Sequence, residues 1–501
     1  MPDFIVVLGC ASNVGKSWVS TGLCALARER GVSVAPFKAR NLSNNAAPAA
    51  DLSGGWGEIG RAQAAQAEAA GVAPHVDMNP ILFKPGGTLG SQLIVHGHPV
   101  DHDGATLEAL TSAAHSALRR LSAQHGLIVV EGAGSPVELN LMDRDLANVP
   151  MVRLAAAIAA ETGGTVSVVL VGDIERGGIF ASMVGTLALL PDDVRALVKG
   201  LVVNRLRGEA RFFADGARLL EARCGVPVLG VLPWSTEINI DPEDDLDISV
   251  LEARPPAALD IAVVRLPGVA NFEDLTSLGA VPGVALRMVD TAEDVAWPDL
   301  LVLPGARDPQ EDLRWMQARG LNRAVCAAAA RGVPVLGLCG GYQLLGQTLA
   351  DPEGHTGAAG TTAGLGLLPV HTVYAADKSV RPTEGESTGA WLFPEGLSVS
   401  GYEIHHGQTS PGTTPLLRVD GGRPEGTVQG NVAGTYLHGL LNSEDARSAL
   451  LTALRARRGL PPLPPVASAA DQRAQGHTAL ARLLEAQLNL DGLLPPPDQM
   501  R

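Results

Sequence analysis

The chain has 501 residues, 46% of them hydrophobic and 4% aromatic, so it can form two or three domains with full apolar cores. Its formal net charge of −15 argues against a general nucleic-acid binder, because binding to a phosphate backbone needs basic surface. The five cysteines are odd in number and form no Cys-x-x-Cys pair. This pattern favours a reducing compartment and excludes a zinc site of that kind.

The location of the protein is predicted from its apolar stretches and its opening residues. No apolar stretch reaches the roughly 18–20 residues that a membrane-spanning helix needs. The opening sequence MPDF leads directly into an apolar strand, so we expect no signal peptide. We therefore expect a cytoplasmic enzyme without a membrane or nucleic-acid partner.

Apolar, β-branched runs alternate with alanine- and leucine-rich stretches through the first half of the chain. The clearest helices are expected at residues 17–30 and 58–70, and the strands at residues 5–8, 32–37, 127–131, 166–172, 201–204 and 228–232. Continuous apolar strands between helices predict an α/β fold whose parallel sheet is covered on both faces.

A break in this pattern separates two predicted units. The acidic run DPEDDLD and the sequence ARPP indicate a linker. A second series of strands follows at residues 261–265, 285–289, 300–303, 333–338 and 435–437. We expect a first α/β domain at 1–235, a linker at 236–258, a second α/β domain at 259–450 and a helical, proline-rich appendage at 451–501.

A phosphate-binding loop is predicted where the first strand ends. There GCASNVGKSW contains Asn13 and Gly15, and Lys16 and Ser17 open the first helix. Backbone N–H groups at a helix N-terminus suit phosphate oxygens, Lys16 can neutralise their charge, and the Ser17 hydroxyl can reach Mg²⁺. The spacing is one residue longer than Gly-x4-Gly-Lys-Ser/Thr. It resembles the variant loop of the dethiobiotin synthetase and cobyrinate amidase group, which uses ATP to activate carboxylates.

Two acidic residues stand where predicted strands end. Glu131 and Asp173 each follow an apolar run, at the edge of a parallel sheet where metals and activated waters are usually held. A helix cap or a surface turn would also place an acid there, so both interpretations stay open.

Further segments carry a resemblance to a known family. They are PFKARNLSNN (36–45), GEIGRAQAAQAEAAG (57–71), HVDMNPILFKP (75–85), VVEGAGSPVELNL (129–141) and VGDIERGGIFAS (171–182). Together they resemble the cobyric acid synthase family over nearly the whole chain. The resemblance implies a P-loop domain of the dethiobiotin synthetase type that uses ATP with Mg²⁺, and no tightly bound organic cofactor.

The resemblance also implies roles for residues of the first domain. Glu131 would bind Mg²⁺ together with Ser17, and Glu58 is a less favoured ligand. Lys38 would face the reacting carboxylate and phosphate, where a cation stabilises the charge in transfer.

The resemblance also bears on two expected nucleotide contacts and on two positions where the sequence differs from the family pattern. Asp173 and Asn204 are assigned to ATP binding. Asn204 is placed like the adenine-reading asparagine of related ATPases, although an ordinary turn residue would look the same. The family usually has Thr where Cys10 stands and Asp where Asn13 stands, so this loop carries one negative charge fewer beside the phosphates.

The second domain contains a predicted cysteine nucleophile. VPVLGLCGGYQLLG indicates a strand, a tight turn and a helix, with Cys339 at the turn of a nucleophile elbow. The following helix N-terminus favours a thiolate. A buried structural cysteine is the alternative from this motif alone.

Two downstream features favour a glutaminase. GTYLHG places His438 at a strand end, as in class I glutamine amidotransferases, which have a flavodoxin-like α/β domain and hydrolyse glutamine through a thioester. LVLPGARD supplies Gly305, whose backbone N–H region would join that of Gly340 as an oxyanion hole.

Three further features of the second domain stand out in its sequence. Most members of that class have glutamate two residues after the histidine, but here that position is Leu440. Cobyric acid synthases also lack this acid, so its absence supports the resemblance. The sequence does not show what orients His438. In GYEIHHGQT, another family match, His405 and His406 are poor candidates for catalysis, because nothing places them near Cys339. Arg307 stands where the family commonly has lysine.

The resemblance implies a reaction as well as a fold. ATP and glutamine would be used to amidate the b, d, e and g carboxylates of adenosylcobyrinic acid a,c-diamide, giving cobyric acid in cobalamin biosynthesis. The implied partners are ATP, glutamine and a corrinoid polycarboxylate, and the sequence does not predict the oligomeric state.

Three alternatives stay open at this point. The nearest is an enzyme that amidates the a and c carboxylates of the same corrin, but KARNLSNN and HVDMNPILFKP favour the later-acting enzyme. An amidotransferase of peptidoglycan lipid precursors would consist of separate short chains. A non-catalytic, partitioning-type ATPase scaffold would not need Lys16, Cys339 and His438.

Overall fold

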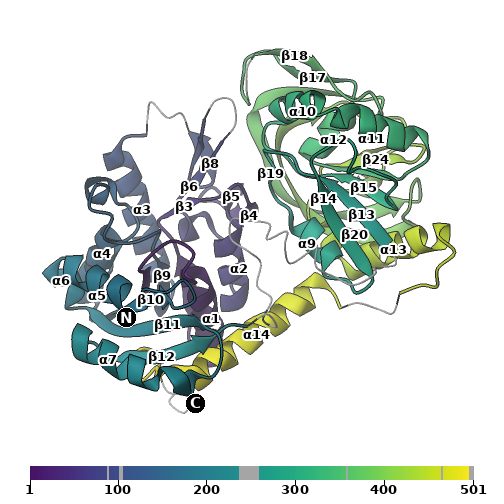
Figure 1. Ribbon diagram of the computed structural model, residues 1–501. Helices are drawn as coiled ribbons and strands as arrows, with labels where there is room; N and C mark the ends of the chain where they lie inside the picture. The colour runs from purple at the N-terminus through teal and green to yellow at the C-terminus, as the bar shows by residue number, and fades with distance from the viewer. Residues whose placement is uncertain are drawn as a thin grey trace.

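The computed structural model describes residues 1–86, 90–100, 105–235, 238, 259–356, 359–463 and 467–495. Two α/β units lie side by side, and the C-terminal helix α14 (Ala469–Gln487) returns from the second unit to the first (Figure 1). Within the described ranges, no helix is both apolar enough and long enough to cross a bilayer.

The first unit is built on a six-stranded parallel sheet with the strand order β12-β11-β10-β1-β9-β2. The strands are β1 (Asp3–Gly9), β2 (Val34–Phe37), β9 (Leu127–Glu131), β10 (Val166–Asp173), β11 (Val198–Leu206) and β12 (Val228–Pro233). Because β9 and β10 flank β1, the two strands that end in acids lie on either side of the strand that feeds the phosphate loop. The parallel α/β fold predicted for this unit is confirmed.

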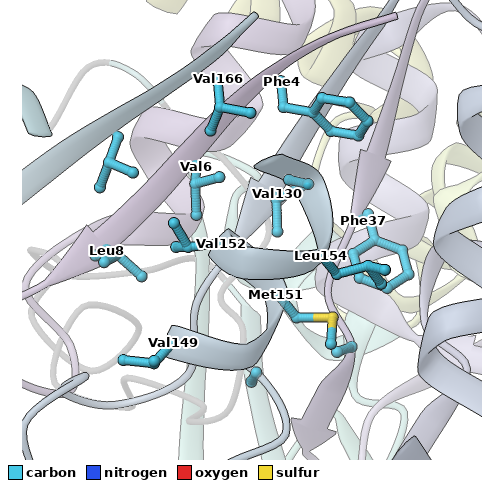
Figure 2. Close-up of a cluster of buried hydrophobic side chains, with 14 of the residues drawn as sticks. Phe4, Val6, Leu8, Phe37, Val130, Val149, Met151, Val152, Leu154 and Val166 are labelled. Carbon is cyan, nitrogen blue, oxygen red and sulfur yellow. The ribbon is translucent and has the colours of Figure 1, made fainter. Parts of the chain in front are cut away.

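Helices cover both faces of this sheet, as its continuous apolar strands require. They are α1 (Lys16–Glu29), α2 (Arg61–Ala70), α3 (Leu107–Ser122), α4 (Val149–Thr162), α5 (Ile179–Leu189), α6 (Asp192–Arg195) and α7 (Ala214–Cys224). Alternate residues of β1 point to opposite faces: Phe4 and Val6 pack with Val152 of α4 (Figure 2), whereas Ile5 packs with Leu23 of α1.

The C-terminal helix completes the second of these faces. Leu480 and Leu484 of α14 are fully buried against α1. The helices approach closely at Gly22, where a Cβ atom would lie 2.5 Å from a Leu484 methyl carbon. An ion pair of 2.9 Å joins Arg30 to Glu485. The helical part of the expected appendage therefore belongs to the core of the first unit.

Two small sheets of the first unit face the second. They are the four-stranded sheet β3 (Arg40–Leu42), β6 (Ile81–Lys84), β7 (Gln92–Val95) and β8 (His98–Val100), and the hairpin β4 (Ala46–Ala50) and β5 (Trp56–Gly60). The helix expected at residues 58–70 begins later, at Arg61, because Glu58 pairs with Pro48 in the hairpin.

The second unit contains another six-stranded sheet with the order β14-β13-β15-β16-β24-β23, parallel except for β23. Its strands are β13 (Leu259–Val264), β14 (Val284–Val289), β15 (Leu300–Leu303), β16 (Val335–Leu338), β23 (Thr427–Gln429) and β24 (Val432–Thr435). Its helices are α9 (Glu273–Gly279), α10 (Pro309–Ala318), α11 (Leu321–Ala330), α12 (Gly340–Leu345) and α13 (Glu444–Arg457). The strand expected at residues 435–437 thus lies slightly earlier in the chain.

A further sheet joins the second unit to the first. It comprises β17 (Thr348–Asp351), β18 (Gly360–Ala363), β19 (His371–Thr388), β20 (Glu395–Thr409), β21 (Leu417–Val419) and β22 (Arg423–Glu425). Its long strands β19 and β20 contact the β4–β5 hairpin. Tyr402 and Ile404 of β20 form one apolar cluster with Ala46, Leu82 and Ile94 of the first unit.

The proposed domain boundaries stay predictions. The expected linker 236–258 lies outside the described residues apart from Ile238. Helix α13 runs across position 450, and its companion α14 packs on the first unit.

Candidate active sites

The phosphate-binding loop forms as the sequence pattern requires. Asn13 is exposed and left-handed at φ +58°, and Gly15 is left-handed at φ +98° immediately before α1. A Cβ atom on Gly15 would lie 2.1 Å from the Asn204 side-chain nitrogen, so only glycine fits this position. Lys16 Nζ lies across the loop and donates to the carbonyl oxygens of Ala11 (3.0 Å) and Gly134 (2.9 Å).

A buried carboxylate gathers the polar groups beside this loop. Glu131, at the end of β9, accepts hydrogen bonds on Oε1 from Ser17 Oγ and Lys38 Nζ, both at 2.8 Å. Its Oε2 accepts one from Gln66 Nε2 at 2.6 Å. The structure therefore brings Ser17, Lys38 and Glu131 together. Gln66 was not predicted as a site residue, although a buried glutamine on an alanine-rich helix is a signal for such a role.

On the other side of β1, Asp173 is bound by arginine. Its Oδ2 accepts from Arg205 at 3.0 Å and its Oδ1 from the Glu175 backbone N–H at 2.9 Å. Asn204, the last residue before Arg205, donates its amide to the Val14 carbonyl oxygen at 2.9 Å. The Asn204 side chain thus supports the loop backbone directly.

Glu58 lies in a different environment from the other predicted metal ligands. It is fully buried on β5 and forms ion pairs with Lys84 of β6 and Lys378 of β19. Despite its burial, these two cations hold the pKa of the Glu58 carboxyl at about 2. The structure thus does not group Glu58 with Ser17 and Glu131, but uses it to bind the two units together.

The oxygens beside the loop suit Mg²⁺. Ser17 Oγ and Glu131 Oε1 are 2.8 Å apart, so one ion could contact both. Mg²⁺ prefers such hard oxygens and is usually held by one or two protein ligands together with phosphates and waters. Over the described ranges, no group of three His, Cys, Asp or Glu side chains could hold a metal without that help.

Cys339 occupies a sharp turn between β16 and α12. Its backbone is at φ +48° and ψ −105°, a strained conformation typical of a nucleophile elbow. The Cys339 N–H donates to the Thr435 carbonyl oxygen at 2.7 Å, and Sγ lies 3.7 Å from the Ile404 carbonyl oxygen. Burial raises the pKa of the thiol to about 12.

His438 follows β24 and is buried in the same region. Its ring stacks on Tyr402, with the ring centroids 5.4 Å apart. Burial lowers the pKa of the imidazole to about 4. The resting thiol and imidazole are therefore both uncharged near neutral pH.

The two predicted oxyanion-hole glycines lie against this pair. A Cβ atom on Gly305 would be 2.8 Å from His438 Cε1, and one on Gly340 would be 2.7 Å from the Ala306 nitrogen. Both positions therefore require glycine, and the backbone after Gly305 lies next to the residue that follows Cys339.

One cavity, of about 440 Å³, connects Cys339 and His438 with the first unit. Cys339, His438 and Lys378 line it from the second unit, and Asn44 and Lys84 from the first.

The sequence did not place His405 and His406 near Cys339, but both line this cavity together with it. Long-range pairing of β19 and β20 brings them there. His405 stacks on Tyr436 at 3.7 Å, and His406 lies 3.2 Å from the Gln92 amide of the first unit.

Arg307, the departure from the family lysine, also crosses between the units. Its guanidinium donates to the carbonyl oxygens of Lys84 (2.6 Å) and Gly90 (2.9 Å).

Comparison with known families agrees with this two-part arrangement. A model described as "CobQ/CobB/MinD/ParA nucleotide binding domain" matches residues 5–248. A second, "CobB/CobQ-like glutamine amidotransferase domain", matches residues 260–446. A nucleotide-binding P-loop domain joined to a cysteine elbow with its histidine defines a glutamine-dependent amidotransferase of the ligase type.

Relatives of similar length identify the family. The cobyric acid synthase of Desulforudis audaxviator is 43% identical, with 98% of this chain and 99% of that protein covered. That of Jannaschia sp. is 42% identical, with 99% of each covered. The chain belongs to the cobyric acid synthase family, and the resemblance predicted from its motifs is confirmed.

Proposed function

We propose that this enzyme uses ATP and glutamine to amidate the b, d, e and g carboxylates of adenosylcobyrinic acid a,c-diamide, giving cobyric acid in cobalamin biosynthesis. The similarity over 98% of the chain to a relative named cobyric acid synthase carries the choice of substrate. The two sites and the cavity between the units support the chemistry.

The first step would take place at the loop of the first unit. A substrate carboxylate oxygen attacks the γ-phosphorus of ATP, ADP leaves, and an acyl phosphate forms. Lys16 would exchange its carbonyl partners for phosphate oxygens, and Lys38 would stabilise the charge in transfer. Ser17 and Glu131 would hold Mg²⁺, which neutralises phosphate charge when bound.

Other residues of this unit would support the site. We propose that Asn204 braces the loop through Val14 and does not read the adenine, because its amide nitrogen is committed to the backbone. Asn13 and Gly15 shape the loop, and Asp173 with Arg205 borders the nucleotide site on the β10 side.

Glutamine hydrolysis would supply the nitrogen. Cys339 Sγ attacks the side-chain amide carbon of glutamine while His438 accepts the thiol proton. Backbone N–H groups of Gly340 and the segment after Gly305 stabilise the oxyanion. The proton passes to the leaving nitrogen, ammonia departs, and water hydrolyses the thioester to glutamate.

The cavity between the units would shield the ammonia on the part of its route that begins at Cys339. Free ammonia would be protonated in water and would lose its nucleophilicity. The cationic side chains of Lys84 and Lys378 line this cavity and disfavour a second cation, ammonium, more than neutral ammonia. Attack of ammonia on the acyl phosphate then gives the amide and phosphate.

The remaining requirements of the enzyme follow from these steps. Side chains and ATP supply all the chemistry, so we propose that no tightly bound organic cofactor is needed. We also propose a cytoplasmic location, because all five cysteines are free and Cys339 must remain a thiol to react.

Mass spectrometry of the corrin product tests the substrate assignment. The enzyme is incubated with MgATP, glutamine and adenosylcobyrinic acid a,c-diamide, and each amidation exchanges a hydroxyl for an amino group. We expect four successive exchanges and little reaction with unamidated cobyrinic acid. If the enzyme instead amidates the unamidated acid twice and stops, the earlier-acting alternative is correct.

A further inference from the structure

The structure shows what holds His438 in the absence of an acid at Leu440. Tyr402 and His438 exchange both backbone hydrogen bonds, at 3.0 and 2.9 Å, and their rings stack. The Tyr402 hydroxyl donates to the carboxylate of Glu273, the first residue of α9. The base is therefore fixed from the β20 side by a tyrosine that is itself held by α9.

The start of α9 also holds the segment that follows the base. Asp274 is fully buried, and its two carboxylate oxygens accept the backbone N–H groups of Gly439 (2.8 Å) and Leu441 (2.7 Å). Asn271 lines the same cavity as His438. We name residues 271–274 the α9 turn; it lies beside the base and contacts the tyrosine behind it and the chain after it.

The first unit in turn holds the α9 turn. Asn271 N–H donates to Asn45 Oδ1 at 2.9 Å, and Ala46 N–H donates to Asn271 Oδ1 at 2.8 Å. Both asparagines are buried. Asn271 is left-handed at φ +52°, a conformation that needs such support in a residue other than glycine. Arg61 of the first unit adds a favourable charge beside Asp274.

We propose that the Asn45–Asn271 pair is a positioning element by which the ATP-binding unit holds the glutaminase base in its working orientation. The inference rests on the proposed role of His438. Asn45 lies in the segment that follows Lys38 in the chain, so a change at the carboxylate-activating site can reach the base through two hydrogen bonds and the α9 turn. Glutamine hydrolysis then depends on the state of the other unit.

A purely structural interface would behave differently. Loss of general stability would lower every activity of the enzyme, whereas a misplaced base lowers only kcat for glutamine hydrolysis. A loosened His438 would also admit water, and its pKa would rise from about 4 towards the ordinary value. The other groups whose charges act on the ring are Glu273, His405 and Lys84.

The test uses Asn45→Ala in the full-length enzyme. We expect kcat for glutamine hydrolysis to fall by about 10²-fold, the cost of misplacing a catalytic group by about 1 Å. KM for glutamine and amidation with ammonium salts should stay near the wild-type values. The acid limb of the glutaminase pH profile should move to higher pH. Asn45→Asp keeps the Oδ1 acceptor and should restore most of the activity.

Two further variants keep the test decisive. Asn271→Gly keeps the left-handed backbone but removes the acceptor for Ala46, so it should cause a smaller loss of glutaminase kcat. It replaces Asn45→Ala as the test if Asn45→Ala does not fold. If Asn45→Ala has wild-type glutaminase kinetics while His438→Ala is inactive, the positioning role of the Asn45–Asn271 pair is wrong and the proposed function still holds. Glutaminase activity retained in His438→Ala would instead overturn the proposed function.

Discussion

The two candidate sites of this enzyme treat charge in opposite ways. Beside the phosphate loop, charged groups contact one another: the Lys38 ammonium donates to the same Glu131 carboxylate oxygen as the Ser17 hydroxyl. At the cysteine elbow, burial keeps Cys339 and His438 uncharged, with pKa values of about 12 and about 4. Each arrangement suits its reaction, because phosphoryl transfer needs charge neutralisation, whereas the glutaminase must deliver a neutral nucleophile.

The contrast also explains the interface between the units. Buried Glu58 and Lys84 pair with the Lys378 side chain at the interface, and both lysines line the cavity. This places fixed positive charge between a site that uses ions and a site that uses neutral groups. The substitutions described below alter one site, the other site or the interface between the units, and so test this difference.

The largest effect is expected from Cys339→Ala. Glutamine-dependent amidation should fall by about 10³-fold or more, because no nucleophile remains to form the thioester. Amidation with ammonium salts should persist, since the loop site is untouched. Both rates are measured by ADP release and product mass. Cys326→Ala, at a half-buried cysteine of the same unit, is the matched control. Equal loss with both nitrogen donors would show that Cys339 is structural.

Lys16→Ala should impair the site at the phosphate-binding loop. Removing one charge contact to the transferring phosphoryl group typically lowers the rate by about 10²–10³-fold. Here we expect this loss of amidation with either glutamine or ammonium salts as the nitrogen donor. Lys199→Ala, at an exposed lysine of the same unit, should leave both rates unchanged. Near-normal ammonium-dependent amidation in Lys16→Ala would mean that ATP binds elsewhere.

Glu58→Ala should weaken the interface. It leaves two buried lysines without their shared carboxylate, which typically costs about 3–5 kcal/mol of stability. Thermal unfolding should show a clearly lower Tm. Glu161→Ala removes an exposed partner of Arg119 and should not change the Tm. A wild-type Tm in Glu58→Ala would show that the three residues do not form a buried ion cluster.

The C-terminal helix gives a comparable test of the first unit. Leu484→Ala should destabilise it by about 2–5 kcal/mol, because Leu484 is fully buried against α1. Urea unfolding of the first unit measures the loss, and exposed Arg482→Ala is the control. An unchanged midpoint would mean that α14 is an appendage, as expected from sequence, and not part of the core of the first unit.

The smallest change concerns pH. His438 can accept the thiol proton only when neutral, so glutaminase activity is lost as the pH falls through the imidazole pKa. With that pKa at about 4, kcat/KM for glutamine should stay high well below the ordinary histidine value. A steady-state pH profile measures it. An acid limb at or above the ordinary value would show that His438 is not desolvated.

Local sequence patterns were sufficient to predict the geometry of both turns. The GKS tripeptide after a strand and the GLCGG turn each encode their geometry within a few residues, so the positions of Lys16, Ser17 and Cys339 at these turns could be predicted directly. Glu131 was found because parallel strands present their ends at one edge.

The residues that were missed depend on contacts between distant segments. Lys378 meets Glu58 only because β19 lies against the β4–β5 hairpin, and Asn271 meets Asn45 only across the interface. Such pairs leave no periodic pattern. The packing of α14 on α1 likewise joins the two ends of the sequence. The proline-rich segments around α14 do not indicate this contact.

One isotope measurement tests most directly whether the two sites act as one enzyme joined by the cavity. Glutamine labelled at its amide nitrogen is supplied with MgATP and corrin substrate, in the presence of excess unlabelled ammonium salt at a pH where ammonium predominates. We predict that the new amides carry the label of glutamine almost undiluted, because ammonia passes from Cys339 to the acyl phosphate within the protein. Label diluted to the bulk ratio would contradict this, and would mean that ammonia leaves into solvent between the two reactions.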